Sequence, residues 1–388
     1  MKAPDSADIA HCLAASAQFD SIIDVRSPSE YALDHIPNAV NLPVLSDEQR
    51  VTVGTLYKQT SSFEAKRLGA ALVARNIADA LQTTLATKPR DWSALIYCWR
   101  GGNRSGAMAT VLARVGWQIT VLDGGYRAFR RHVNEQLQEL PQRYRYRVIA
   151  GRTGSAKSAL LRLLQRQGAQ VLNLEALAKH RGSVLGSELD QAQPPQKQFD
   201  TLVWSSLHRF DRLRPIYVES ESKKLGQIHV PDALIAQMRA SPCIVINASD
   251  DFRIDHLLDE YKHFVAQPAL LLKQLDHLRA LHGDAHIDAW AQLVSAHRWR
   301  ELVTQLLHGH YDPSYDRSMK RNFSLLDQAL QLRVDGSIEY SLEAAARSIV
   351  QAESQAEVQA EVQAEVQAEV QAETQAESQA KAQVAGDK

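Results

Sequence analysis

Short apolar runs alternate with helical patterns from residue 21 to residue 248 of this 388-residue chain, and this alternation limits the fold more than any other feature. Each run is long enough for one strand, and helical periodicity falls between the runs. Strands separated by helices form parallel sheets, so an α/β fold is expected. The runs are "SIIDV" (21–25), "SALIYC" (93–98), "QITVLD" (118–123), "YRVIA" (146–150), "AQVLNLE" (169–175), "RPIYVESE" (214–221) and "PCIVINA" (242–248).

The chain divides near Pro141 into two such α/β domains. Helices are expected at 103–115 and 126–139 in the first domain, and at 157–167, 197–212, 231–239 and 251–264 in the second. From about residue 268 the pattern becomes mostly helical. The predicted organisation is a first domain over 8–135, a second over 141–268, a helical extension over 269–348 and a low-complexity tail over 351–388.

The tail repeats "QAEV" or close variants with a period of four. Residues four apart advance about 400° around a helix, so the valines drift by roughly 40° per repeat and form no lasting stripe. A coiled coil, which needs a period of 3.5, is disfavoured, and a solvated helix or a disordered segment remains. The tail carries a net charge of −6 against −1 for the whole chain, which leaves a mildly basic +5 for residues 1–350.

The composition, 45% apolar and 23% charged, is typical of a globular protein. No run reaches the roughly 18 uncharged apolar residues of a membrane span, and the first 20 residues lack a signal-peptide pattern. We therefore expect a cytoplasmic protein with no membrane partner. The cysteines Cys12, Cys98 and Cys243 include no C-x-x-C pair, so interest in them concerns reactivity rather than disulfides or zinc.

Cys98 lies in "YCWRGGNRSG" (97–106), between an apolar strand and a glycine-rich turn into a helix. Backbone N–H groups of such a turn point toward the sulfur, and Arg100 and Arg104 add positive charge. Both effects lower the pKa of a thiol and bind an anion beside it. The alternative is a buried cysteine that merely ends a strand.

The segments around this loop resemble the rhodanese family. "IIDVRSPSEYALDHIPNAVNLP" (22–43) is similar to its first signature and "VLDGGYRAFR" (121–130) to its second, with Cys98 between them. The resemblance implies a rhodanese-like parallel-sheet domain in which Cys98 carries sulfur or selenium. Five residues separate Cys98 from Arg104, where many single-domain rhodaneses have four. Because C-x5-R is also the spacing of cysteine phosphatases, a phosphatase remains an alternative.

A second glycine-rich turn, in "VIAGRTGSAKSALLRLL" (148–164), fits the phosphate-binding P-loop between a strand and an amphipathic helix. Its backbone N–H groups would wrap a diphosphate, its lysine would neutralise the charge, and its serine could hold Mg²⁺. Alanine stands where the last glycine is usual, which costs on the order of 1 kcal/mol if that position needs a positive φ. The candidate phosphate-binding residues are Gly151, Thr153, Gly154, Ser155, Ala156, Lys157 and Ser158.

Charged residues follow other strands of the second domain. Glu175 follows "VLNL", Glu219 and Glu221 follow "PIYV", and His180 and Arg181 lie in "LAKHRGS". Ligands of α/β proteins bind at the carboxyl edge of the sheet, so these side chains are candidates for the pocket beside the P-loop. The alternative is an ordinary solvated surface. No metal centre built from protein ligands alone is predicted.

The order of the two domains, and several strings, resemble the bacterial tRNA 2-selenouridine synthase family over roughly residues 8–325. The strings are "CWRGGNRS", "GRTGSAKS", "LEALAKHRGS", "VESESKKLGQIHVP" and "YDPSYDRSMKR" (311–321). In this resemblance the second domain is a P-loop NTPase-like α/β domain, and Ala156 departs from the glycine that the family normally has.

The resemblance implies a transferase that converts wobble 2-thiouridine in the anticodon loop of tRNA to 2-selenouridine. Geranyl diphosphate would alkylate the sulfur, and selenium from selenophosphate would then replace the S-geranyl group, with Cys98 as perselenide carrier. Both donors are co-substrates, Mg²⁺ is a candidate metal, no tightly bound cofactor is implied, and a selenophosphate-supplying enzyme is a candidate partner. A simple sulfurtransferase with a nucleotide-sensing P-loop domain remains an alternative.

The tRNA leaves the weakest trace in the sequence. "RYRYR" (143–147) interleaves arginine and tyrosine, which suits phosphate contact and base stacking. The same string is equally compatible with the edge of the next strand. The sequence predicts no oligomeric state.

Overall fold

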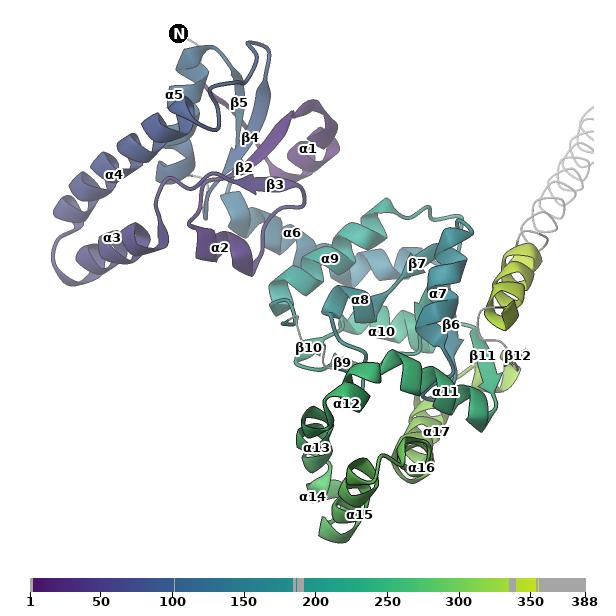
Figure 1. Cartoon of the computed structure of the whole chain (residues 1–388). Helices are drawn as coiled ribbons and strands as arrows, with labels where there is room; N and C mark the ends of the chain where they lie inside the picture. Colours follow the sequence, from purple (N-terminus) through teal and green to yellow (C-terminus); the bar gives the residue numbers. More distant parts are fainter. Residues whose placement is uncertain are drawn as a thin grey trace, which may run out of the picture. The chain divides into compact units, whose positions relative to one another are not determined.

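The computed structural model describes residues 3–100, 102–183, 186, 192–334, 340–353 and 355. Figure 1 shows two parallel sheets with helices packed around them, which confirms the α/β class. Most of the predicted "QAEV" tail falls outside the described residues. Contacts divide the chain into a first unit of residues 1–145, 174–214 and 221–240 and a second unit of residues 146–173, 215–220 and 241–388.

The sheet of the first unit has five parallel strands in the order β1-β5-β4-β2-β3. Its three inner strands are the apolar runs that the sequence predicts. The two edge strands have only three residues each, too few for a recognisable period. The strands are β1 (Asp5–Ala7), β2 (Ser21–Asp24), β3 (Ala39–Asn41), β4 (Ser93–Tyr97) and β5 (Gln118–Leu122).

Helices pack against this sheet and complete its core. The two helices predicted at 103–115 and 126–139 are present as α5 and α6, and Met108 and Leu112 of α5 pack against Ile96 and Ile119 of the sheet. A long helical pair, α3 and α4, lies between β3 and β4 in the sequence. The helices are α1 (Ile9–Ala14), α2 (Pro28–Leu33), α3 (Asp47–Gln59), α4 (Ser62–Gln82), α5 (Asn103–Val115) and α6 (Gly125–Glu139).

A fully buried ion pair at the end of β2 contacts α6 through the ring of Tyr126. Arg26 and Asp24, both at most 1% exposed, meet with Nε of Arg26 3.0 Å from each carboxylate oxygen. The Arg26 guanidinium also lies 3.9 Å from the ring centroid of Tyr126, whose hydroxyl donates to Asp34 at 2.7 Å. Because a buried charge is stable only when paired, this network fixes the position of the α6 N-terminus relative to the sheet.

Three later helices belong to the first unit, namely α8 (Leu174–Ala178), α9 (Gln196–Arg209) and α10 (Asp232–Arg239). Arg130 of α6 bonds Asp200 of α9 at 3.0 Å, and Phe129 meets Trp204 edge to face with ring centroids 5.7 Å apart. A short hairpin of β9 (Lys224–Leu225) and β10 (Ile228–His229) accompanies them. The domain boundary predicted near Pro141 places α8, α9 and α10 in the second domain. Their contacts instead place them in the same unit as α6.

The second unit holds a parallel sheet in the order β12-β11-β6-β8-β7. The central strand β6 leads into the P-loop and then α7 (Lys157–Arg166), whose Leu160, Leu161 and Leu164 are buried against the sheet. The edge strand β12 lies in the region expected to be mostly helical. The strands are β6 (Tyr146–Ala150), β7 (Gln170–Leu172), β8 (Ile216–Glu219), β11 (Cys243–Ala248) and β12 (Leu330–Val334).

The predicted helical extension follows β11 in this unit. Among the described residues, no helix is both long and apolar enough to cross a membrane. A single π-helical turn, 307–311, joins the last two helices of the run. The helices are α11 (Asp250–Glu260), α12 (Lys262–Ala266), α13 (Pro268–Asp276), α14 (Arg279–His282), α15 (Asp284–Ser295), α16 (Trp299–Leu306) and α17 (Asp312–Asn322).

The buried pair predicts a large stability difference between two arginine substitutions. Arg26→Met leaves the Asp24 carboxylate buried without its partner and should cost about 3–5 kcal/mol. Arg67→Met breaks the exposed pair with Glu64, with a nitrogen–oxygen distance of 2.6 Å, and should cost less than about 1 kcal/mol. Urea unfolding followed by circular dichroism measures both. Equal shifts of the first unfolding transition would contradict the role given to the Asp24–Arg26 pair.

Candidate functional site

Cys98 directly follows β4 and precedes the helix α5, as the sequence predicts. Its side chain is buried, with 4% of its surface exposed. The Ser105 hydroxyl in the first turn of α5 donates to the sulfur at 3.2 Å and accepts from the Gly102 N–H at 3.3 Å. Gly101 lies outside the described residues.

The loop around Cys98 lowers the pKa of its thiol. Burial alone raises this pKa. Hydrogen bonds donated to the sulfur lower it by more than burial raises it, so the pKa lies below its usual value. The donors are the Ser105 hydroxyl and the backbone N–H groups of Ser105, Arg100 and Gly102. Hydrogen bonds donated to sulfur stabilise the thiolate, which is the nucleophilic form. The Cys98 side chain therefore has more thiolate character than an ordinary cysteine.

The N-terminus of α6 holds the backbone of the same loop. The Tyr126 N–H donates to the Cys98 carbonyl at 2.8 Å, and the Arg127 N–H donates to the Trp99 carbonyl at 3.1 Å. These two N–H groups belong to the first turn of a helix, where no partner exists within the helix itself. The "DGGYR" segment thus fixes the loop, while the Asp24–Arg26 network fixes the segment.

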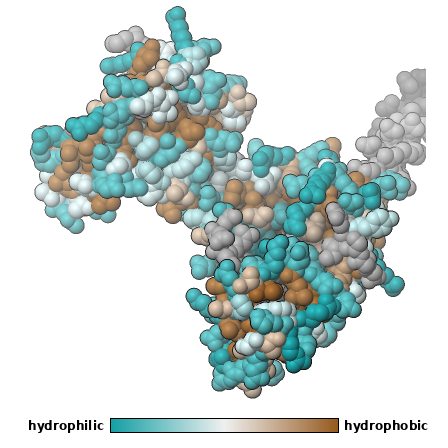
Figure 2. All heavy atoms as spheres, viewed as in Figure 1, coloured by the Kyte–Doolittle hydropathy of each residue, from teal (hydrophilic) through white to brown (hydrophobic). Residues whose placement is uncertain are grey.

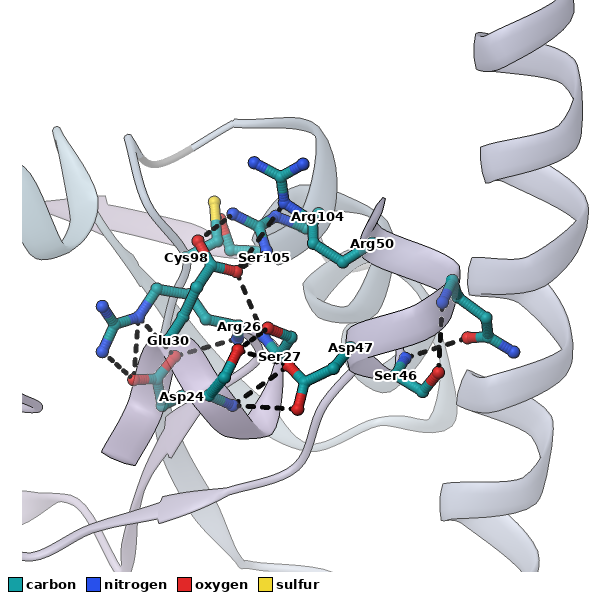
Figure 3. Close-up of polar contacts among 12 residues, drawn as sticks. Asp24, Arg26, Ser27, Glu30, Ser46, Asp47, Arg50, Cys98, Arg104 and Ser105 are labelled. Carbon is teal, nitrogen blue, oxygen red and sulfur yellow. Dashed lines mark hydrogen bonds and ion pairs between the residues drawn. The ribbon is translucent and has the colours of Figure 1, made fainter. Parts of the chain in front are cut away.

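Arg104 is engaged by a carboxylate. Figure 3 shows Cys98 with Arg104, Glu30 and Arg50; Nη1 of Arg104 lies 2.6 Å from Glu30, and Nε of Arg50 lies 3.8 Å from it. Burial raises the pKa of Glu30, but Arg104, then the Ser27 N–H and then Arg50 lower it by a larger total, so this pKa lies below its usual value and the carboxylate is ionised. Arg104 therefore orients the loop, while Arg100 is exposed.

The P-loop of the second unit connects β6 to α7 with three residues at positive φ. Gly151 has φ 153°, Gly154 has φ 83° and Ala156 has φ 61°. A Cβ on Gly151 would lie 2.4 Å from the Ser155 hydroxyl, so the loop closes on itself at this point. Such a ring of backbone N–H groups is an anion-binding concavity.

Lys157 and Tyr315 lie over the P-loop. Nζ of Lys157 donates to the Gly151 carbonyl at 2.7 Å and lies 5.6 Å from the ring centroid of Tyr315. The Tyr315 hydroxyl accepts from the Gly151 N–H at 2.6 Å and lies 3.2 Å from the Ser220 hydroxyl. Tyr315, which contacts Gly151 at the start of the P-loop, thus lies on α17, more than 160 positions downstream.

A buried arginine fastens the middle of the P-loop. Arg253 of α11, 2% exposed, donates from Nε to the Thr153 carbonyl at 2.8 Å and from Nη1 to Asp312 of α17 at 3.0 Å. Arg152 reaches Asp316 on α17 at 2.7 Å. The helices α11 and α17 therefore hold the loop in its observed conformation through one buried ion pair, Arg253–Asp312, and one exposed pair, Arg152–Asp316.

A cavity of about 410 Å³ opens beside the P-loop, within the range of small-molecule sites. Its lining includes the charged residues Arg152, Asp250 and Asp316 and the apolar residues Ile246 and Met319. It can take a ligand that has an anionic end and an apolar body.

Comparisons with known proteins identify the family. The profile of the tRNA 2-selenouridine synthase AAA domain matches residues 144–369, and that of the rhodanese-like domain matches residues 7–132. The chain is 31% identical over 334 residues to the tRNA 2-selenouridine synthase of Sulfurovum sp. (strain NBC37-1), covering 78% of this chain and 90% of that protein. The chain belongs to the tRNA 2-selenouridine synthase family.

Two further relatives carry the same name. The protein of Shewanella oneidensis is 31% identical over 332 residues, covering 77% of this chain and 86% of its own length. The protein of Bdellovibrio bacteriovorus is 35% identical over 251 residues, covering 62% of this chain and 64% of its own length. The rhodanese-like and P-loop domains that the sequence predicts are thus both confirmed.

The sequence predicts strain at Ala156 if this position needs a positive φ. The structure shows that it does, since the Ala156 backbone is left-handed with φ 61° and ψ 34°. This conformation costs about 1–2 kcal/mol for an L-residue with a side chain. The methyl group is buried in the core cluster with Leu160 and Ile246, and this burial offsets part of the strain. The family P-loop therefore forms here without its last glycine.

The other predicted pocket residues fall in both units. Glu175 and Glu221, in the first unit, bring carboxylate oxygens within 4.8 Å of each other, and Nδ1 of the buried His180 accepts from the Gly182 N–H at 3.1 Å. The Arg181 side chain is half-buried in the same segment. Glu219, in the second unit, ends β8 opposite Ile149 of β6 and is fully buried.

The two tyrosines of the "RYRYR" string belong to the core, whereas Arg143 and Arg145 are exposed. Tyr144 and Tyr146 are 7% and 1% exposed, and the Tyr144 hydroxyl donates to the Leu207 carbonyl at 2.5 Å. Buried rings cannot stack on a base, so the stacking interpretation of this string is wrong.

The sequence missed Glu30, Arg50, Arg253, Asp312 and Tyr315. Glu30 lies in the string 22–43 that resembles a rhodanese signature and is the fourth residue of "SPSE", a capping box at the start of α2, but neither pattern points to a partner for Arg104. Asp312 and Tyr315 lie in "YDPSYDRSMKR", which carries the family resemblance but no local pattern of a phosphate site. No sequence signal pointed to Arg50 or Arg253.

Removal of the Ser105 hydroxyl should raise the pKa of Cys98. Ser105→Ala deletes a donor to the thiolate, so the pH midpoint of iodoacetamide alkylation should move upward. Burial raises the pKa values of Cys12 and Cys243 to about 11, so they should not react near neutral pH. Cys98→Ser, the matched control, should show almost no alkylation there. An unchanged midpoint in Ser105→Ala would refute the assigned role of Ser105.

The same substitution at two alanines should have opposite effects on stability. Ala156→Gly relieves left-handed strain and should raise the free energy of unfolding by up to about 1 kcal/mol, after loss of the buried methyl group. Ala159→Gly, in the first turn of α7, should lower it by up to about 1 kcal/mol. Thermal unfolding followed by circular dichroism compares the two. A loss of stability at both sites would mean that the strain at Ala156 is negligible.

Proposed function

We propose that this chain converts wobble 2-thiouridine of tRNA to 2-selenouridine through an S-geranylated intermediate. Geranyl diphosphate and selenophosphate are the co-substrates. The observation that carries this proposal is one chain with two anion-binding loops, one around a thiol with a lowered pKa and one with a P-loop lysine. Sulfur transfer alone would need only the first.

The P-loop suits the alkylation step. The tRNA sulfur attacks C1 of geranyl diphosphate, a carbon–sulfur bond forms, the carbon–oxygen bond breaks, and diphosphate leaves with the electron pair while the uracil ring loses a proton. Lys157 and the P-loop N–H groups stabilise the departing charge. The cavity beside the loop, with Arg152 among its charged residues and Ile246 and Met319 among its apolar ones, matches a diphosphate joined to a hydrocarbon chain.

The residues around the P-loop also fit Mg²⁺, which prefers oxygen ligands. The hydroxyl of Ser158 would hold the ion, and the buried carboxylate of Glu219 lies on β8, the strand next to β6. When bound with diphosphate, Mg²⁺ would neutralise charge on the leaving group.

Cys98 suits the selenium step. The Cys98 thiolate first exchanges with an external disulfide to give a mixed disulfide. Water attacks phosphorus of selenophosphate, the phosphorus–selenium bond breaks with its electron pair on selenium, and phosphate is released. The selenide attacks the Cys98 sulfur, a sulfur–selenium bond forms, and the external thiol leaves. The perselenide then attacks C2 of the modified uracil, and geranyl thiolate leaves. An external thiol attacks the Cys98 sulfur, releases 2-selenouridine and restores the mixed disulfide, which accepts the next selenide. Selenophosphate comes from a separate supplying enzyme.

The pairing of Arg104 disfavours the phosphatase alternative. In a C-x5-R phosphatase this arginine must bind the equatorial oxygens of the phosphate. Here its two terminal nitrogens lie 2.6 and 3.3 Å from the Glu30 carboxylate. An anion at Cys98 would instead meet the backbone N–H groups of the loop.

Two substitutions should stop the reaction at different stages. Cys98→Ser should abolish selenium incorporation and leave S-geranylated tRNA, because the carrier is lost while alkylation persists. Lys157→Ala should lower geranylation at least about 100-fold, because the leaving diphosphate loses its cation. Mass spectrometry of nucleosides from tRNA incubated with protein, geranyl diphosphate and selenophosphate measures both products.

Cys12→Ser and Cys243→Ser are the matched controls and should retain full conversion. If Cys98→Ser still yields 2-selenouridine, the perselenide role is wrong. Turnover of an aryl phosphate without tRNA that depends on Cys98 would favour the phosphatase instead. Tight nucleotide binding by a wild-type protein that modifies no tRNA would favour a nucleotide sensor.

A further inference from the structure

The helical pair α3–α4 of the first unit exposes apolar side chains. None of the residues of α3 is buried, and α4 buries only Ala65, Ile77 and Ala80. Tyr57 is 56% exposed and Phe63 is 69% exposed. Figure 2 shows hydrophobic atoms on the visible surface of this pair, which lies on the left in Figure 1. Exposed apolar surface of this kind marks a candidate binding surface.

The central part of this pair, positions 50–75, is basic, although Asp47, Glu48 and Asp79 bring the net charge of α3 and α4 together to +1. Between positions 50 and 75 it carries five cationic side chains and one anionic one, whereas the whole chain has a net charge of −1. Aromatic rings among cations are typical of surfaces that bind single-stranded nucleic acid, where bases stack and phosphates are neutralised. The six charged residues are Arg50, Lys58, Glu64, Lys66, Arg67 and Arg75.

One side of α3 is continuous with the Cys98 loop. Arg50 lies 3.8 Å from the Glu30 carboxylate, and that carboxylate binds Arg104, which directly precedes the Ser105 that donates to Cys98. This contact orients the Arg50 side of α3 toward the reactive loop.

The side of α3 that carries Arg50 also carries Tyr57. Residues i, i+4 and i+7 share one side of a helix, which places Arg50, Gly54 and Tyr57 together. A Cβ on Gly54 would lie 2.8 Å from Nη1 of Arg50, so the arginine extends along the helix over a position that has no side chain. Seven residues of helix span about 10 Å, the length of about three stacked bases at 3.4 Å each.

We propose that this side of α3 binds the anticodon loop of the tRNA next to Cys98. Tyr57 stacks on an unpaired base, Arg50 and Lys58 contact phosphates, and the neighbouring wobble nucleotide enters the Cys98 loop. This assignment rests on the proposed function, because it places the substrate of that reaction. It also supplies the stacking surface that the buried Tyr144 and Tyr146 cannot provide.

Binding of RNA to the full chain tests this surface. The probe is a fluorescein-labelled anticodon stem-loop RNA with 2-thiouridine at the wobble position, and the readout is the Kd from fluorescence anisotropy. Tyr57→Ala should weaken binding about tenfold, and Tyr57→Trp should restore it, because stacking needs only an aromatic face. Lys58→Ala should reduce the slope of log Kd against log salt concentration by about 1.

Tyr340→Ala, which removes a tyrosine that is 73% exposed in the second unit, is the matched control and should bind like the wild type. Circular dichroism checks that each variant is folded. If Tyr57→Ala binds the RNA within twofold of the wild type, the proposal is overturned and the apolar surface is left to a protein partner. Absence of binding by the wild type overturns it as well.

Selenium loading separates this proposal from the proposed function. Intact-mass measurement of Cys98 after incubation with selenophosphate and a small-molecule disulfide, without RNA, should give the same loading in Tyr57→Ala and wild type. If the wild type binds the stem-loop through Tyr57 but forms no 2-selenouridine, the proposed reaction is refuted and the proposed RNA-binding surface stands. A Tyr57→Ala protein that binds and converts tRNA normally refutes the surface and leaves the function intact.

Discussion

Unpaired backbone N–H groups at strand-to-helix turns are the interaction on which both sites depend. The first turn of a helix has donors with no partner inside the helix, and parallel strands bring such turns to one edge of a sheet. In the first unit the turn after β4 directs donors at the Cys98 sulfur, and the first turn of α6 holds the Cys98 and Trp99 carbonyls. In the second unit the turn after β6 forms the P-loop. The chemistry differs because one turn surrounds a thiol and the other precedes a lysine.

Residues distant in sequence hold each turn in its working conformation. Glu30 binds Arg104 across 74 positions, and Arg253 binds the Thr153 carbonyl across 100. A buried arginine without a carboxylate would be costly, and Asp312 meets Arg253 for this reason. Such buried ion pairs fix the positions of the groups they join but add little net stability, because the cost of removing both charges from water offsets much of their attraction. The P-loop tolerates left-handed Ala156 in this setting, since its neighbours are fixed from several directions.

How much the sequence predicts depends on the range of the interaction. The inner strands, the helices α5 and α6, the position of Cys98 and the P-loop all follow from local periodicity and glycine spacing, and the structure contains them. The edge strands β1 and β3, the grouping of α9 with α6, and the contact of Tyr315 with Gly151 depend on residues far apart in the chain. The "RYRYR" string shows the limit most clearly, because its composition fits both a nucleic-acid surface and a strand edge, and only packing decides between them.

The three cysteines show why burial alone does not decide reactivity. All three are buried, yet burial raises the pKa values of Cys12 and Cys243 to about 11, whereas the pKa of Cys98 is lowered. The desolvation cost is present at Cys98 too, but only there do a hydroxyl and three backbone N–H groups converge on the sulfur. Those donors exist because a glycine-rich turn follows the strand. The residues after a cysteine therefore indicate its chemistry better than the cysteine itself, and a strand that ends in cysteine without such a turn is expected to hold an inert thiol.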